Sequence, residues 1–310
     1  PEQFVPLFPP SRDWETCMTM NGVWGYNAAD QNWKSIETLI RTLAETSGKG
    51  GNFLLNVGPR ANGEIPKPSI ERLEAVGRWL AANGESIYGT TAGPFVHLSW
   101  GAATRKGDRL YLHVFHWPAD GRLRVPLQSK TRAAHLLADP GTPLPIVADQ
   151  ERVIIQLPAK ATDPINSIVV LDLAEPPRAT PPPTLHKPVT ASSQEADAEA
   201  ANVVDGLIST TWYPEKSEQL SGATLEIDLG SNVLVAAYGL GEADVWPRLK
   251  QSYTIELRAG GAWKQVAAGA TDGHGKRGSF PAVKADAARI RLSGVNGRSG
   301  LAEFHLFSPE

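Results

Sequence analysis

Helical patterns are confined to the first ninety residues of this chain of 310, and every later pattern is that of short β-strands. In residues 35–46 apolar side chains recur at helical spacing before a Gly-rich stop, and residues 69–83 repeat this pattern. The runs 16–20 and 52–57, which precede these two helical segments, predict strands. Two βα units in series are typical of a parallel sheet or of the end of a (β/α)₈ barrel.

The rest of the chain predicts two β domains. Short strand patterns recur at regular intervals between residues 94 and 174, as in an antiparallel β-sandwich; they cover residues 109–115, 122–125, 133–137, 152–157 and 168–173. Five of the ten residues 175–184 are proline, which predicts an extended spacer and a domain boundary. Further strand patterns follow at residues 224–229, 253–258, 288–292 and 302–307.

These patterns predict a multidomain chain, since one hydrophobic core rarely grows beyond about 250–300 residues. The expected parts are an α/β domain at residues 1–93, a β-sandwich at 94–174, a linker at 175–184 and a second β domain at 185–310. No apolar run approaches the roughly 18–20 residues of a membrane span. The 30 Lys and Arg against 33 Asp and Glu give a net charge of −3, which favours no nucleic-acid partner.

Carboxylates beside aromatic rings are the chemically informative feature of the first fifty residues. Glu2 lies in a Pro-rich loop, and Glu15 follows Trp14 at the start of a predicted strand, close in sequence to Trp24 and Tyr26. Hydrolysis of a glycosidic bond uses two carboxyl groups, and apolar rings suit a sugar face. Taken alone, each glutamate is better explained as a solvated or structurally paired acid, because acidic residues near tryptophan are common. The single cysteine of the chain excludes an intramolecular disulfide and a multi-cysteine zinc site.

Four motifs in one order resemble family 29 α-L-fucosidases. They read PEQ at residues 1–3, WETCMTMNGVWGYN at 14–27, GGNFLLNVGP at 50–59 and GRWLAANGESIY at 77–88. The resemblance is detailed over residues 1–95 and extends loosely over the predicted sandwich. It implies the end of a (β/α)₈-like barrel and a retaining hydrolase that releases terminal α-L-fucose from glycans without a catalytic cofactor. Extracellular or periplasmic localisation is an expectation from that substrate class.

The resemblance also implies roles for three residues. Glu2 corresponds to the general acid/base, with Glu15 as the second candidate, and Trp24 corresponds to a ring that packs on fucose and its C5 methyl group. A core position is the alternative for Trp24. The family's nucleophilic aspartate and sugar-binding histidines belong to earlier strands, and neither Asp13 nor Asp30 lies in that motif. We therefore expect the sequence to be a piece of a longer protein and to be inactive alone, because retention needs two carboxyl groups about 5–5.5 Å apart.

The C-terminal region resembles a discoidin or coagulation factor 5/8 C-type domain, the fold of family 32 carbohydrate-binding modules. The resemblance rests on NVVDGLISTTW at residues 202–212, LEIDLG at 225–230 and GLAEF at 300–304. It implies a discoidin-like β-sandwich, or jelly roll, with one structural Ca²⁺ held by Asp205, Thr210 and Glu303. The alternative is that Asp205 caps its own turn, which requires no metal.

Aromatic residues of this region supply a candidate sugar site. Trp246, which charged residues flank, is the best candidate for stacking on a glycan, whereas Trp212 and Trp263 are expected to be packing residues. Two functions therefore remain open on the sequence. The chain is either part of an α-L-fucosidase acting on fucosylated glycans or a non-catalytic, lectin-like or adhesive glycan-binding protein.

Overall fold

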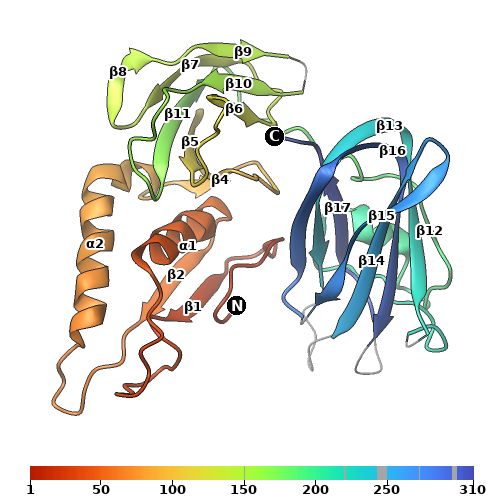
Figure 1. The fold of residues 1–310 in the computed structure, drawn as a ribbon, viewed down its shortest axis with the longest axis horizontal. Helices are drawn as coiled ribbons and strands as arrows, with labels where there is room; N and C mark the ends of the chain where they lie inside the picture. The colour runs from red at the N-terminus through yellow and green to blue at the C-terminus, as the bar shows by residue number, and fades with distance from the viewer. Residues whose placement is uncertain (150, 220, 243–249, 272, 295–298) are drawn as a thin grey trace. The chain divides into compact units, whose positions relative to one another are not determined.

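The computed structural model of the chain describes residues 1–149, 151–219, 221–242, 250–271, 273–294 and 299–310. It divides into two compact units, the first formed by residues 1–5, 13–180 and 310, and the second by residues 6–12 and 181–309. Strands dominate both units, and the two long helices belong to the first (Figure 1). In the part of the chain that the structure describes, no helix has the length and apolar character needed to cross a membrane.

The first unit begins with two βα units, as the periodicity predicts. They comprise β1 (Glu15–Thr19), α1 (Ile36–Gly48), β2 (Asn52–Asn56) and α2 (Lys67–Asn83). Strands β1 and β2 pair in parallel, with Glu15 opposite Asn52 and Thr19 opposite Asn56. Ser35 caps α1 by accepting a hydrogen bond from the backbone N–H of Thr38 at 3.0 Å. These elements lie within a few residues of their predicted positions.

The first three residues extend this small parallel sheet. Glu2 forms a parallel bridge with Cys17, and the backbone N–H of Gln3 donates to the carbonyl of Cys17 at 2.8 Å. Cys17 in turn donates its own N–H to the carbonyl of Pro1 at 3.1 Å. Residues 1–3, β1 and β2 therefore run side by side in one direction, and their carboxyl ends share one edge.

The remainder of the first unit is an antiparallel β-sandwich. A six-stranded sheet has the order β3-β4-β5-β11-β7-β8, and a three-stranded sheet has the order β6-β10-β9. The strands are β3 (Thr91–Ala92), β4 (Gly101–Lys106), β5 (Arg109–Val114), β6 (Arg122–Val125), β7 (Thr131–Leu136), β8 (Asp139–Pro143), β9 (Ile146–Ala148), β10 (Val153–Gln156) and β11 (Ser167–Leu173). The buried core includes Leu110, Leu112, Leu123, Val125, Ile155, Val169 and Leu171. Burying one such side chain contributes about 1.5–3 kcal/mol relative to exposing it.

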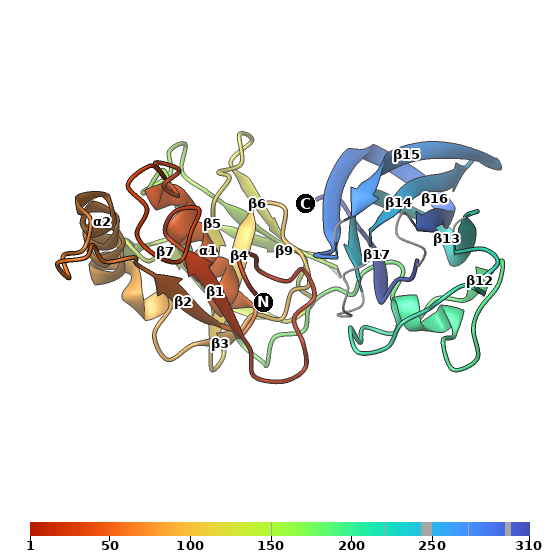
Figure 2. The same ribbon diagram turned by 90° about the horizontal axis from the view of Figure 1, so that it is seen from below.

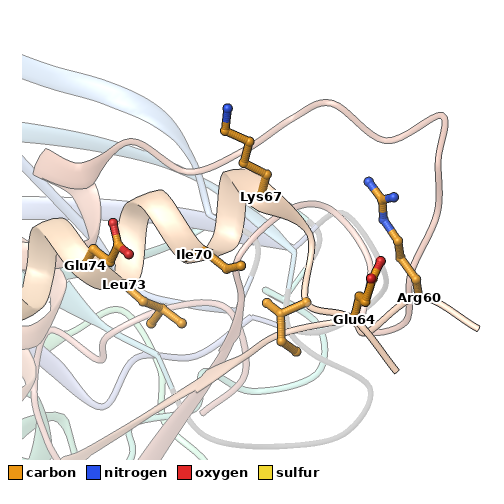
Figure 3. Close-up of a pocket in the computed structure, with 7 residues that line it drawn as sticks. Arg60, Glu64, Lys67, Ile70, Leu73 and Glu74 are labelled. Atoms are coloured by element: carbon orange, nitrogen blue, oxygen red, sulfur yellow. The ribbon is translucent and has the colours of Figure 1, made fainter. Parts of the chain in front are cut away.

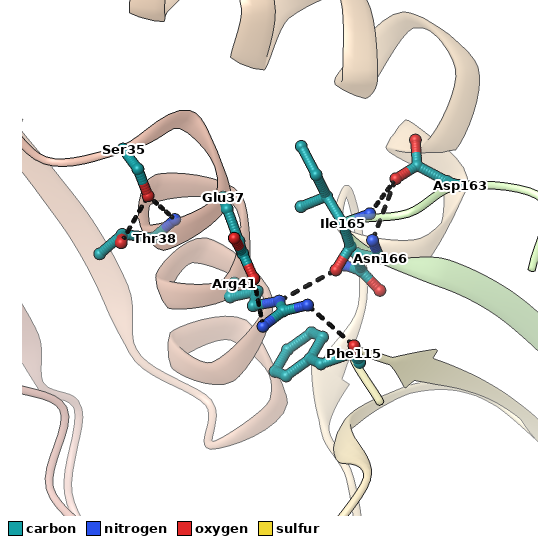
Figure 4. A network of polar contacts seen from close by, with 8 residues as sticks. All are labelled: Ser35, Glu37, Thr38, Arg41, Phe115, Asp163, Ile165 and Asn166. Atoms are coloured by element: carbon teal, nitrogen blue, oxygen red, sulfur yellow. Dashed lines mark hydrogen bonds and ion pairs between the residues drawn. The ribbon is translucent and has the colours of Figure 1, made fainter. Parts of the chain in front are cut away.

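Helices α1 and α2 are attached to the sandwich by apolar packing and by one arginine. A separate buried cluster joins Ile40, Trp79, Tyr111, Ile168 and Val170. Figure 4 shows the side chain of Arg41 on α1 reaching into two loops of the sandwich, where it donates to the carbonyl of Ile165 at 3.0 Å and to that of Phe115 at 2.8 Å. Its guanidinium also lies 5.4 Å from the centroid of the Phe115 ring. These contacts hold α1, and with it the parallel strands, on a rigid support.

The second unit is a β-sandwich built around two long, bent strands. Its strands are β12 (Val189–Ala191), β13 (Ala223–Gly241), β14 (Gln251–Ala259), β15 (Ala262–Thr271), β16 (Lys276–Gly294) and β17 (Glu303–Phe307). Their order is β12-β13-β16-β14-β15, and β17 pairs with the last part of β13 (Figure 2). The register between β13 and β16 shifts between Asp228 and Val233, which marks an irregularity in the long pair. The buried core includes Trp212, Leu225, Ile227, Val235, Ile255, Leu257, Ile290 and Phe304.

An N-terminal segment, residues 6–12, belongs to this second unit. Leu7 is buried there, and the ring of Phe8 lies 5.6 Å from the ring of His305. Two glycines of β13 leave the necessary room, since a Cβ on Gly239 would lie 2.9 Å from Leu7 Cδ2 and one on Gly241 would lie 2.8 Å from Phe8 Cδ2. The sequence predicts an extended Pro-rich loop here but not this packing.

Candidate functional site

The structure brings together two of the residues singled out by sequence, Glu2 and Trp24. The indole N–H of Trp24 donates to Glu2 Oε1 at 3.0 Å, although 22 positions separate the residues in the chain. Glu2 is exposed, and Trp24 is 42% exposed, so Trp24 is not the core residue of the alternative interpretation. Both side chains lie near the shared carboxyl edge of residues 1–3, β1 and β2. An accessible carboxylate with an accessible indole ring is the arrangement needed to protonate a glycosidic oxygen beside a bound sugar.

The backbone that carries Glu2 is anchored through its neighbour, Gln3. Gln3 adopts a left-handed conformation with φ of 65°, and its side-chain amide bonds Thr19 twice, donating to Oγ1 at 3.1 Å and accepting from the backbone N–H at 3.3 Å. Lys34 donates to the carbonyl of Thr19 at 2.6 Å, and burial lowers the pKa of this lysine. The strained position of Gln3 is thus supported by hydrogen bonds on its side chain.

The loop between β1 and α1, which carries Trp24, is closed by Asp30. The carboxylate of Asp30 accepts from the backbone N–H of Gly22 at 2.8 Å and from that of Asn32 at 3.0 Å. A turn stabilised in this way needs an aspartate for structural reasons alone. This contact accounts for Asp30 without any catalytic role.

Glu15, the second candidate for the acid/base, has a different partner. It lies at the amino end of β1 and accepts a hydrogen bond from the Cys17 thiol at 3.3 Å. That bond to Glu15 is the main reason that the pKa of Cys17 is raised. The adjacent Trp14 is buried and donates its indole N–H to the carbonyl of Lys49 at 3.2 Å. The aromatic neighbour that the sequence suggests for Glu15 is therefore engaged elsewhere.

A groove with a volume of about 590 Å³ lies along the start of α2 and was not anticipated from the sequence (Figure 3). Its exposed apolar floor comes from Ile70 and Leu73, and charged residues including Arg60 and Glu74 border it. The guanidinium of Arg60 also lies 5.7 Å from the centroid of the Tyr26 ring. The groove therefore adjoins the loop of Trp24 but is lined by neither Trp24 nor Glu2.

In the second unit, the three residues predicted to bind calcium include two in direct contact. Asp205 Oδ2 accepts from the Thr210 hydroxyl at 2.7 Å, and Asp205 Oδ1 accepts from the backbone N–H of Leu207 at 2.8 Å. The latter bond is the turn cap of the alternative interpretation. Glu303 is buried, and its Oε2 lies 2.8 Å from Nε2 of His305. Burial raises the pKa of Glu303 most strongly; the His305 contact opposes this shift, and the nearby Asp205 adds to it.

The donor set around Glu303 suits a hard cation only in part. Glu303 Oε1 is buried without a hydrogen-bond partner, and Asp205 supplies a second carboxylate close by. Oxygen donors of this kind are those that Ca²⁺ prefers. Among the described residues, however, no group of three or more His, Cys, Asp or Glu side chains could hold a metal ion. A calcium site here would need hydroxyl, backbone or water oxygens to complete it.

The tryptophans of the second unit separate into distinct environments. Trp212 is fully buried and donates to the carbonyl of Ser193 at 3.1 Å, so the prediction of a core residue is confirmed. Trp263 is half-buried, and the guanidinium of Arg289 lies 4.3 Å from its ring centroid. Trp246, the predicted sugar-stacking residue, lies outside the described residues.

Comparisons with known proteins find separate matches for the two ends of the chain. Residues 1–85 match the family model "Alpha-L-fucosidase", and residues 188–304 match the model "F5/8 type C domain". An α-L-fucosidase of Dictyostelium discoideum is 33% identical over 170 residues, which make up 53% of this chain and 35% of that protein. The chain thus spans about a third of the length of the curated relatives that it matches first.

Solved structures of α-L-fucosidases are also similar to this chain. An α-L-fucosidase of family GH29 from Bacteroides thetaiotaomicron, described as a trapped covalent intermediate with 2-fluoro-fucosyl fluoride, matches with a TM-score of 0.51 and 26% identity over 56% of this chain and 42% of its own. An α-L-fucosidase of Vibrio sp. strain EJY3 matches all of this chain and 57% of its own, with a TM-score of 0.60. At 19% identity, the latter match shows the fold alone. The region 1–85 is therefore similar to α-L-fucosidases, and the region 188–304 is similar to F5/8 type C domains.

Proposed function

We propose that the chain is part of a retaining α-L-fucosidase that releases terminal α-L-fucose from glycans. The observation that carries this proposal is the contact between Glu2 and Trp24 at the carboxyl edge of parallel strands. The match to α-L-fucosidases over residues 1–85 supports it. So does the covalent intermediate of the Bacteroides relative, because a covalent glycosyl-enzyme is the mark of a retaining mechanism.

In this mechanism Glu2 acts as the general acid and then as the general base. Its carboxylic acid protonates the leaving glycosidic oxygen, and its carboxylate later removes a proton from the water that hydrolyses the intermediate. Trp24 offers an exposed indole face to the sugar ring and the C5 methyl group of fucose, which replaces the hydroxymethyl group of other hexoses. Glu15 is the second candidate for the acid/base. A further carboxylate must act as the nucleophile.

The fold proposed for this function places β1 and β2 as neighbouring strands at the end of a (β/α)₈-like barrel. Their parallel pairing, the helix that follows each strand and the site at their carboxyl ends support this proposal. We retain the division into a catalytic region at residues 1–93, a β-sandwich at 94–174, a linker at 175–184 and a glycan-binding module at 185–310. Fucosylated glycans are the proposed partners, and an extracellular or periplasmic location follows from them.

Hydrolysis of 4-nitrophenyl α-L-fucoside by the natural polypeptide that contains this sequence tests the proposal. The expected result is release of 4-nitrophenol, with α-L-fucose as the first sugar product detected by proton NMR. A first product of β configuration would overturn the retaining mechanism. The match to an F5/8 type C domain favours one alternative, a lectin-like glycan-binding protein. A polypeptide that binds glycans without hydrolysing any fucoside would decide for that alternative.

The second unit is proposed to bind one structural Ca²⁺ through Asp205, Thr210 and Glu303. The partnerless oxygen of Glu303 and the nearby Asp205 carboxylate support this proposal, since a divalent cation would balance their negative charges. We propose no catalytic role for the ion. The site acts by holding the turn that follows Asp205 against β17, the strand that contains Glu303.

Calcium is therefore expected to raise the melting temperature of the second unit. A ligand that binds only the folded state adds about 1.4 kcal/mol of stability at a tenfold excess over its dissociation constant. Differential scanning calorimetry with millimolar CaCl₂ and with EDTA measures this effect, and Asp205→Asn is expected to abolish it. An unchanged transition in millimolar CaCl₂ would instead leave Asp205 with the turn-capping role alone.

A further inference from the structure

The position of the Glu2 carboxylate depends on Trp24. Glu2 is exposed, and an exposed glutamate without a fixed partner samples several side-chain rotamers. The hydrogen bond of 3.0 Å from the Trp24 indole selects among these rotamers. Whatever fixes Trp24 therefore also fixes Glu2.

Trp24 is held by the last residue of β2, Asn56. The side-chain amide of Asn56 donates to the backbone carbonyl of Trp24 at 2.7 Å. The backbone carbonyl of the same Asn56 accepts from the N–H of Met20 at 3.2 Å. Asn56 thus binds the loop after β1 both at its start and at the residue that contacts Glu2.

Gly58, in the turn that follows β2, allows the loop that carries Trp24 to pack closely against the end of this strand. A Cβ atom at this position would lie 2.7 Å from the carbonyl carbon of Gly25 and 2.7 Å from the backbone nitrogen of Tyr26. Any side chain there would push the loop away from β2, because both neighbours are backbone atoms. The residue that follows Trp24 therefore lies directly against the end of β2.

We propose that Asn56 is a positioning residue for the general acid/base, which it acts on through Trp24. This inference rests on the proposed function of Glu2. The chain of contacts is short: the Asn56 amide fixes the Trp24 backbone, and the Trp24 indole holds Glu2 Oε1. A merely structural Asn56 would affect stability without changing how strongly the reaction depends on acid catalysis.

The substitution Asn56→Asp in the natural polypeptide separates these roles. Aspartate has the same size but offers an oxygen, in place of an N–H donor, to the Trp24 carbonyl. Misplacing a catalytic group by about 1 Å can cost about 10²-fold in rate. We expect kcat/KM to fall by about 10–100-fold for aryl α-L-fucosides with poor leaving groups, and by much less for the 2,4-dinitrophenyl fucoside, whose departure needs little protonation.

Asn52→Asp is the matched control, because Asn52 is an exposed asparagine at the amino end of the same strand. This control is expected to keep the wild-type rates and leaving-group dependence. The melting temperatures of both variants identify any loss that comes from unfolding alone. Gly58→Ala perturbs the same loop where it contacts the turn after β2. It is expected to change the leaving-group dependence in the same direction as Asn56→Asp.

An NMR measurement on the 310-residue chain tests the contacts without activity. The indole ¹H–¹⁵N signal of Trp24, assigned with Trp24→Phe, is expected to shift in Glu2→Gln and in Asn56→Asp but not in Asn52→Asp. Full activity of Glu2→Ala would overturn the acid/base role proposed for Glu2 and, with it, the catalytic meaning of Asn56, whereas a natural polypeptide that hydrolyses no fucoside would overturn the proposed function itself. An inactive Glu2→Ala combined with unchanged leaving-group dependence in Asn56→Asp would overturn the positioning role alone.

Discussion

Replacing Glu2 by alanine in the natural polypeptide is expected to lower kcat/KM for 4-nitrophenyl α-L-fucoside by about 10²–10⁴-fold, the usual contribution of general acid–base catalysis. The loss is expected to be larger for fucosylated glycans, because a sugar hydroxyl is a poorer leaving group than 4-nitrophenol and needs protonation more. Glu2 is exposed beside Trp24, so its removal should leave the fold unchanged. Steady-state kinetics with both substrate types measure the effect.

Rescue by azide tests whether the Glu2→Ala variant has lost the general acid/base. A small anion can enter the space of the missing carboxylate and attack the glycosyl-enzyme without base catalysis, so azide is expected to restore turnover of Glu2→Ala and to yield α-L-fucosyl azide. The same measurement on Glu15→Ala compares the two candidates. If Glu15→Ala loses activity and azide restores it, while Glu2→Ala keeps normal rates, the acid/base is Glu15. That result would contradict the inference drawn from the Trp24 contact.

Much of the fold follows from the periodic spacing of apolar residues. The strands that the sequence analysis did not predict lack such spacing. The amphipathic spacing in residues 35–46 and 69–83 correctly predicts α1 and α2. Helix α1 buries its apolar face, whereas α2 buries Trp79 but leaves Ile70 and Leu73 exposed. β4 (Gly101–Lys106) was missed because it begins with small residues, Gly-Ala-Ala, which have little β-propensity. β8 (Asp139–Pro143) was missed because proline and glycine are depleted in strands, and it is tolerated as the edge strand of its sheet.

The candidate site was predictable as a set of residues but not as a set of contacts. Sequence motifs single out Glu2 and Trp24, yet their hydrogen bond depends on residues 1–3 pairing with the middle of β1, which no local pattern encodes. Asn56 and Gln3 were missed as positioning groups because a polar residue at a strand end has no distinctive spacing. The packing of Leu7 in the second unit joins segments more than two hundred residues apart. Only the folded chain reveals such contacts.

Acid is expected to destabilise the first unit through His113, a fully buried residue of β5. Its Nε2 lies 3.3 Å from the Thr104 hydroxyl, which itself donates to the carbonyl of Ser86, and its Nδ1 lies 3.1 Å from the Asn166 amide nitrogen. This arrangement suits a neutral ring protonated on Nε2. Burial lowers the pKa of His113 from 6.5 to about 4, because a charged imidazolium would lose its hydration.

The direction of the pH effect follows from this depressed pKa. Between pH 6.5 and about pH 4 the unfolded chain binds a proton on His113 that the folded chain does not, so stability is complete above pH 6.5 and falls as the pH falls. The loss reaches about 3 kcal/mol at pH 4. Urea unfolding followed by tryptophan fluorescence measures it, since the ring of Trp79 lies 6.5 Å from that of His113.

The variant His113→Gln removes this titration and keeps a polar side chain of similar length. It is expected to be less stable than the wild type at pH 7, because the packing of the ring is lost, but to lose less stability on acidification. The difference in unfolding free energy between the two proteins should therefore shrink by about 3 kcal/mol from pH 7 to pH 4. His116→Gln, a substitution at an exposed histidine, controls for the general effect of removing a histidine. A difference that stays constant with pH would show that His113 accepts its proton as readily in the folded chain as in the unfolded one.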